Sequence, residues 1–106
     1  MWNANGNSIT MTQNDFGVGL PLSFPETEIN EEDTLAFIIK KSSGGQVIIN
    51  KTFTNISNSS IEIALTKEES AKLLTGSYVW KVNWYRGQQF LMCLIGPAPF
   101  KVVSGG

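Results

Sequence analysis

The most regular alternation of apolar and polar residues in the chain lies between residues 76 and 85. Every second residue from Tyr78 to Trp84 is aromatic or apolar, and most of the residues between them are polar. This period of two is typical of a β-strand with one buried face. Aromatic side chains bury about 150–250 Å² each, so we predict that this strand forms the centre of the core. The predicted core residues are Phe37, Ile63, Tyr78, Trp80, Val82 and Trp84.

Shorter stretches with similar patterns predict the other strands. They cover residues 9–12, 16–22, 34–40, 46–53, 61–65, 90–95 and 100–103. Pro97 and Pro99 are expected to separate the last two strands, because proline cannot donate a ladder hydrogen bond. The near-continuous apolar character of residues 90–95 indicates burial on both faces, or a sheet edge that something else covers.

A short helix is predicted just before the central strand. Thr66 and Glu69 have the spacing of a capping box, and Gly76 stands where a helix stop is expected, so the helix covers about residues 67–74. In immunoglobulin-like sandwiches a tyrosine at such a corner bonds back across it, and Tyr78 has this position. With about seven to eight strands, the pattern predicts an all-β, immunoglobulin-like β-sandwich. A generic strand after a helix is the alternative.

The predicted domain covers residues 8–103. Residues 1–7 place asparagine and glycine around Trp2, a composition that predicts a flexible N-terminal arm, and residues 104–106 form a short tail. Trp2 has nothing local to pack on. We therefore expect it either to fold back over an open sheet edge or to dock on a neighbouring subunit.

Charge and composition exclude several functions. The 8 basic and 9 acidic residues give a net charge of -1, and no basic cluster exists that could bind nucleic acid. Five of the acidic residues lie within residues 26–33, where the spacing of a calcium loop is missing, so we expect a solvated turn rather than a cation site. The chain has no histidine, and its acidic residues lie in predicted turns and on the helix, apart from Glu62 on the polar side of a predicted strand. We therefore expect no enzyme, no metal site and no cofactor.

The apolar segments are short. The longest apolar run, residues 91–95, cannot span a bilayer, and the N-terminus lacks the pattern of a signal peptide. We expect no membrane contact and no secretion by a signal peptide. Cys93 is the only cysteine, and its apolar neighbours predict a buried thiol in a reducing compartment.

The candidate interaction residues are Trp2 and four residues around a predicted hairpin tip. Tyr85, Arg86, Gln88 and Gln89 offer the stacking and hydrogen-bonding groups that a sugar would meet. The alternative for Tyr85 is that it caps the core.

Four stretches of the chain together resemble one family. They are MTQNDFGV at 11–18, EDTLAFII at 32–39, LTKEES at 65–70 and LTGSYVW at 74–80. The family is the small immunoglobulin-like proteins of phages and prophages, found among tail and baseplate genes, and the resemblance covers about residues 8–103. It implies a non-enzymatic virion structural or accessory protein that contacts itself or other phage structural proteins, with no cofactor. We then expect synthesis in the cytoplasm of a bacterial host, followed by a place in the virion. The alternative function is a module that binds a host-surface glycan or another cell-surface component.

Overall fold

The computed structural model describes residues 2–17, 19–24, 27–42, 44–54, 56 and 59–104. Within these residues, eight strands and one helix form an all-β fold, as the sequence predicts. The elements are β1 (Trp2–Asn5), β2 (Ser8–Thr12), β3 (Leu20–Ser23), β4 (Asp33–Lys40), β5 (Val47–Phe53), β6 (Ser60–Ile63), α1 (Lys67–Ala71), β7 (Gly76–Arg86) and β8 (Gln89–Val103). Each predicted strand overlaps an observed one.

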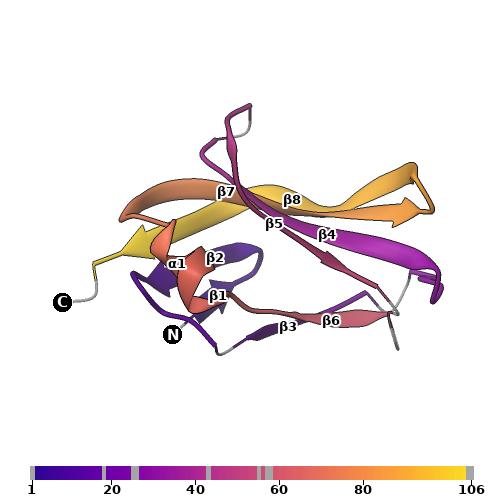
Figure 1. The fold of residues 1–106 in the computed structure, drawn as a ribbon, viewed down its shortest axis with the longest axis horizontal. Coiled ribbons are helices and arrows are strands. Elements are labelled where there is room, and N and C mark those ends of the chain that lie inside the picture. The colour runs from indigo at the N-terminus through magenta and orange to yellow at the C-terminus, as the bar shows by residue number, and fades with distance from the viewer. Residues whose placement is uncertain are drawn as a thin grey trace.

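The strands form two layers (Figure 1). Among the described residues, the larger sheet has the order β1-β2-β8-β7-β4-β5, and the smaller sheet pairs β3 with β6. Neighbouring strands are antiparallel except β2 and β8, which are parallel. The β7–β8 turn lies at one end of the molecule, and α1 lies with β1 and β2 at the other. This arrangement confirms the predicted β-sandwich, whereas its immunoglobulin-like identity stays a prediction.

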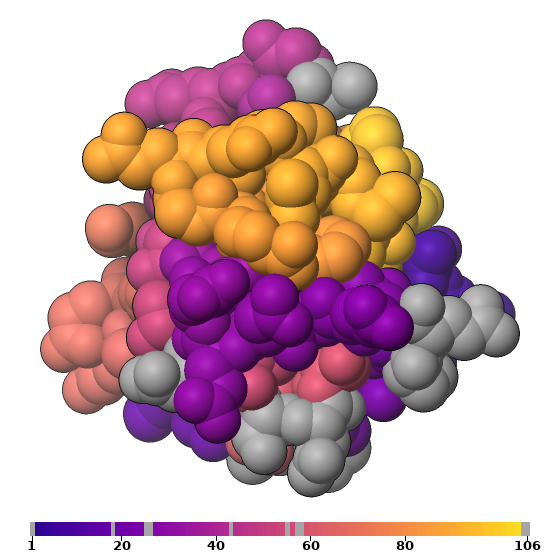
Figure 2. Space-filling model, turned by 90° about the vertical axis from the view of Figure 1, so that its right-hand side faces the viewer, coloured from indigo at the N-terminus to yellow at the C-terminus, as the bar shows by residue number. Residues whose placement is uncertain are grey.

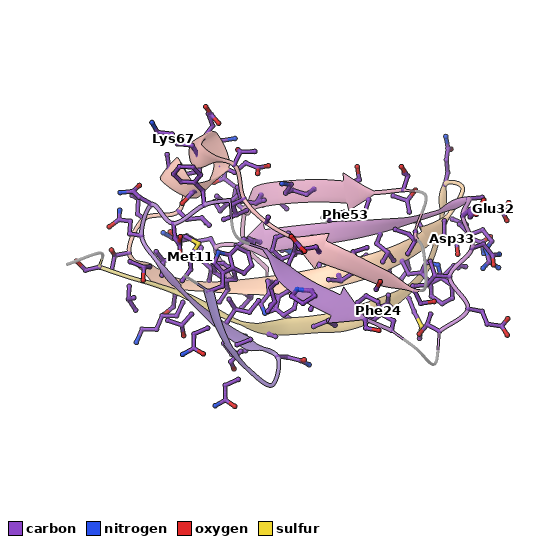
Figure 3. The ribbon with its side chains drawn as sticks, turned by 90° about the horizontal axis from the view of Figure 1, so that it is seen from below. Met11, Phe24, Glu32, Asp33, Phe53 and Lys67 are labelled. Carbon is purple, nitrogen blue, oxygen red and sulfur yellow. The ribbon has the colours of Figure 1, made fainter. Side chains whose placement is uncertain are left out.

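The core lies on the inward-facing side of β4 and β7. Phe37 and Ile39 on β4 lie opposite Val82 and Trp80 on β7, and all four side chains are buried. Met11 on β2 is also buried, and Figure 3 shows its side chain among the strands. Of the predicted core residues, Phe37, Ile63, Tyr78, Trp80 and Val82 are buried and Trp84 is half-buried.

The predicted capping box and corner are both present. Thr66 Oγ1 accepts from the Glu69 N–H at 3.1 Å, and Glu69 Oε1 accepts from the Thr66 N–H at 2.8 Å. Tyr78 Oη donates to the Leu74 carbonyl at 2.8 Å, which is the predicted bond across the corner.

The helix is shorter than predicted, because it ends at Ala71 and not at residue 74. The N–H of Leu73 bonds to the Ser70 carbonyl three residues earlier, which tightens the last turn and directs the fully buried Leu73 into the core. Gly76 is accordingly the first residue of β7 and not the helix stop.

The N-terminal residues differ from the prediction of a flexible arm. Residues 2–5 form β1, which pairs with β2 and places Trp2 opposite Met11. The Trp2 ring is buried against Phe37 and Phe100, with ring centroids 6.3 and 5.5 Å apart. Burial of an indole between two aromatic rings offsets the entropy of ordering this segment. Trp2 therefore folds back onto its own sheet, the first of the two alternatives that the sequence leaves open.

The expected break at the two prolines is also absent, because β8 runs through both Pro97 and Pro99. In the described part of the chain, β2 pairs with β8 only from Phe100 onward, so the side of β8 next to the prolines has no neighbouring strand. A proline whose missing N–H faces such an open edge removes no ladder bond.

Candidate interaction surface

The β7–β8 hairpin brings four of the five sequence candidates together. Arg86 pairs with Gln89, and residues 87 and 88 form the turn between them, with Gly87 at a φ of 61°. Two-residue hairpin turns need such a positive φ, which glycine adopts without strain. Tyr85, Arg86, Gln88 and Gln89 therefore all lie at the hairpin end, with the side chains of Tyr85 and Arg86 on opposite faces of β7. Trp2, the fifth candidate, is buried in the core and takes no part in this surface.

Two of these side chains are held by contacts within the protein. The Tyr85 ring is half-buried and meets the Phe90 ring edge-on, with centroids 5.6 Å apart. The guanidinium of Arg86 lies over the Trp84 ring at 5.7 Å and forms an ion pair with Asp33 at 2.9 Å. Arg86 thus joins the hairpin to the start of β4. Of the four candidates, Gln88 and Gln89 are the exposed polar residues that these contacts do not involve.

Asp33 is the residue whose role the sequence did not reveal. Expected in a solvated acidic turn, it is fully buried at the start of β4, whereas its neighbour Glu32 is exposed (Figure 3). Its carboxylate accepts from the Asn30 N–H at 2.9 Å, from the Trp84 indole N–H at 2.8 Å and from two nitrogens of Arg86.

These contacts determine the charge state of Asp33. The hydrogen-bonded Arg86 guanidinium lowers the pKa of Asp33 well below its usual range; burial raises it by less, and the Asn30 and Trp84 bonds lower it further. The same contact raises the pKa of Arg86. Both groups are therefore ionised near neutral pH, and their ion pair joins the end of β7 to the start of β4.

Beyond the turn, the first half of β8 exposes apolar side chains, with Phe90 and Met92 on opposite faces of the hairpin. Phe90 is 53% exposed and Met92 48% exposed, and Cys93 is exposed as well. The predictions of burial on both faces and of a buried thiol are therefore wrong, whereas a sheet edge that something else covers stays a prediction. Figure 2 shows this part of the hairpin as a broad surface that projects above β4. Residues 87–100 include no charged side chain.

Two irregularities explain why this segment is almost continuously apolar. Between residues 90 and 95 the pairing of β8 with β7 shifts at two places, which leaves Leu91 and Leu94 without a pairing partner of their own on β7; a third shift lies between Ile95 and Ala98. At such bulges two consecutive residues lie opposite one residue of the neighbouring strand. Leu94 and the following Ile95 both pack against the core. Doublets of apolar residues therefore suit this strand although it is not covered on both faces.

The outer side of β8 is open along this segment. From Phe90 to Pro99 no strand within the described residues pairs with that side, because β2 starts its pairing at Phe100. An edge of this kind exposes unpaired backbone N–H and C=O groups that can bind another strand. Pro97 and Pro99 limit the usable edge to about residues 90–95.

A pocket of about 140 Å³ lies behind this surface, on the other side of the prolines. It is lined by Lys40, Val79, Trp80, Lys81 and Pro97. Typical small-molecule sites measure about 300–1,000 Å³, so this pocket is too small for a ligand of ordinary size.

Other kinds of site are not formed by the described residues. They contain no group of three metal-ligating side chains. No helix in the same ranges has the length and apolar character needed to cross a membrane. Comparisons of the chain with protein families, with curated proteins and with solved structures return no match.

Proposed function

We propose that this chain is a non-enzymatic structural or accessory protein that acts through protein–protein contacts made by the β7–β8 hairpin. The resemblance to the small immunoglobulin-like phage proteins adds the setting, which is the tail or baseplate of a bacterial virus. The partners are then copies of the chain or other structural proteins of the same particle.

One observation carries the proposal, namely the exposed apolar segment on the open edge of β8. Phe90 and Met92 are each about half exposed, within a run of fourteen residues, 87–100, that carries no charge. Natural proteins usually protect an open edge with charged residues, and an apolar one that is left uncovered indicates a site for another protein. Aromatic residues and methionine are enriched in such interfaces.

Two features of the hairpin favour a protein partner over a sugar. Tyr85 uses one side of its ring to contact Phe90, and Arg86 is engaged by Asp33, so two of the four groups that a sugar would meet are already committed. The exposed groups that remain are mainly apolar, which suits a protein surface.

Co-purification tests the proposal. The affinity-tagged chain is expressed together with the genes that flank its own, and the recovered proteins are identified and quantified by mass spectrometry. We expect a tail or baseplate protein, or an untagged second copy, to be recovered with the wild type and to decrease at least tenfold with Phe90→Lys. The matched control is Leu74→Lys, since Leu74 is 64% exposed and lies away from the hairpin, before β7.

Two results would contradict the proposal. The first is recovery of no protein together with a strictly monomeric chain. The second is binding to a glycan array that Tyr85→Ala abolishes and Phe90→Lys leaves unchanged, which would favour the ligand-binding alternative.

A further inference from the structure

We infer that the partner of the open β8 edge is a second copy of this chain, bound antiparallel about a two-fold axis at Cys93. The inference rests on the proposed function and names the partner. In this arrangement residues 91–95 of one copy lie against residues 91–95 of the other, Phe90 lies opposite Gly96 at each end, and the two larger sheets join edge to edge.

The geometry of the edge sets the length of this contact. It begins at the hairpin turn at residues 87 and 88 and ends before Pro97, and β2 occupies the edge only from Phe100. The contact from residue 90 to residue 96 spans about 20 Å. Phe100, where the pairing of β2 begins, would lie opposite residue 86 of the other copy, beyond its hairpin turn, so the β2 strand of each copy lies outside the contact.

Charge makes the edge compatible with itself. A two-fold contact places each residue near the axis close to its own counterpart, so a charged side chain there would face a like charge. Residues 87–100 have no such side chain. Among the other open strands of the described chain, β5 carries Lys51 and β6 carries Glu62, whereas β1 and β3 are uncharged but only four residues long. Short edge strands offer little length for pairing with another chain.

The bulges at Leu91 and Leu94 decide what kind of contact forms. Bulges interrupt a ladder and twist an edge, which limits the number of backbone hydrogen bonds that a second strand can add. Apolar side chains must therefore supply most of the binding free energy. With Cys93 on the axis, Met92 of each copy lies opposite Leu94 of the other. The exposed Phe90 rings lie on the other face of the sheet, one at each end of the contact.

Light scattering after size exclusion, over a hundredfold range of concentration, measures the association. We expect the mass to rise from 11.6 kDa toward twice that value. Met92→Lys and Phe90→Lys should each raise the dissociation constant at least tenfold, whereas Leu74→Lys should leave it unchanged. An equimolar mixture of Met92→Lys and Met92→Glu should recover the dimer, because the two positions lie diagonally across the axis. Thermal unfolding of each variant establishes that it is folded.

Oxidation locates the axis, because Cys93 is the only cysteine. Cα atoms of directly opposed residues in an antiparallel pair lie about 4.5–5.5 Å apart, within the range of a disulfide. Under a mild oxidant at equal protein concentration, we expect the wild type to cross-link at least ten times faster than Met92→Lys. A chain that carries Cys93→Ser and Leu74→Cys, with its thiol exposed elsewhere, should cross-link as slowly as Met92→Lys.

The outcomes separate this inference from the proposed function. A strict monomer, or a dimer that neither lysine variant weakens, would overturn the inference. If such a monomer still binds a tail or baseplate protein in a Phe90-dependent manner, the proposed function stands and only the identity of the partner is wrong.

Discussion

At the start of β4 one buried carboxylate joins three segments of the chain. Asp33 accepts hydrogen bonds from the loop before β4, through Asn30, and from the end of β7, through Trp84 and Arg86. Burying a single charge costs several kcal/mol unless it is paired and hydrogen-bonded. The position of the hairpin therefore depends on this one side chain.

Replacing Asp33 by asparagine should lower the free energy of unfolding by about 2–4 kcal/mol at pH 7, because the Asn30 and Trp84 donors and Arg86 lose a buried, charged acceptor. Glu32→Gln is the matched control, since Glu32 is exposed and its substitution should change stability by less than about 0.5 kcal/mol. Urea unfolding followed by tryptophan fluorescence measures both.

Acid should reduce the difference in stability between the wild type and Asp33→Asn. The pKa of Asp33 is lower in the folded than in the unfolded state, so its contribution is complete above about pH 4 and decreases as the pH falls below the unfolded value. The gap between wild type and Asp33→Asn should therefore be about 1 kcal/mol smaller at pH 3 than at pH 7. An equal gap at the two pH values would show that the charge of Asp33 is unimportant for stability.

At the residue scale, local patterns predicted some side chains and not others. Alternation was sufficient to predict that Tyr78 and Trp80 face the core, because a strand fixes the direction of each residue. Asp33 is the last of several acidic residues in the segment 26–33, and no local feature sets it apart from the others. Its pairing with Arg86, 53 residues away, determines that it is the buried one. The exposure of Cys93 likewise depends on where β2 stops pairing with β8, which no local pattern contains.

Among the elements, α1 is the one whose capping hydrogen bonds the sequence predicted. Its capping box has a second function in the structure, because Lys51 on β5 donates to Glu69 at 3.0 Å and to the Ala64 carbonyl at 2.7 Å. Glu69 therefore joins the start of the helix to the edge strand of the larger sheet. This link between elements could not be predicted from the spacing of Thr66 and Glu69 alone.

Removal of the cap tests the helix start. Thr66→Ala should lower the free energy of unfolding by about 1 kcal/mol, because the Glu69 N–H loses its acceptor. Thr66→Ser keeps the oxygen and should retain most of that stability. Thermal unfolding of both variants provides the comparison, and an equal loss in the two would assign the effect to the methyl group rather than to the cap.

In β8 the sequence contained a signal that a simple period of two does not describe. The doublets Leu91-Met92 and Leu94-Ile95 each contain a bulge position, and bulges let adjacent residues lie opposite a single partner. The alternation rule therefore suggested coverage on both faces. Pro97 and Pro99 suggested that the strand ends, because proline interrupts a strand that has a neighbour on both sides. On an open edge the strand can continue through them.

On the scale of the whole molecule, the two layers are unequal, because the described chain places six strands in one sheet and two in the other. The smaller sheet cannot cover the whole inner face of the larger. The β1–β2 hairpin lies at the end that holds α1 (Figure 1). There Trp2 closes this gap, because its ring packs on Phe37 and Phe100. At the opposite end lies the β7–β8 hairpin with its open edge. The aromatic packing of Trp2 and the proposed contact surface therefore lie at opposite ends of the fold.

This separation predicts opposite results for two variants. Trp2→Ala should lower the free energy of unfolding by about 3 kcal/mol through the cavity it leaves, yet should not change self-association at concentrations where the protein is folded. Trp2→Phe should cost less, because the Trp2 indole N–H is buried and has no hydrogen-bond partner in the described ranges, and phenylalanine removes it while keeping a ring. Phe90→Lys should do the reverse, weakening association with little loss of stability. If Trp2→Ala instead abolished association in a folded protein, β1 rather than β8 would form the contact.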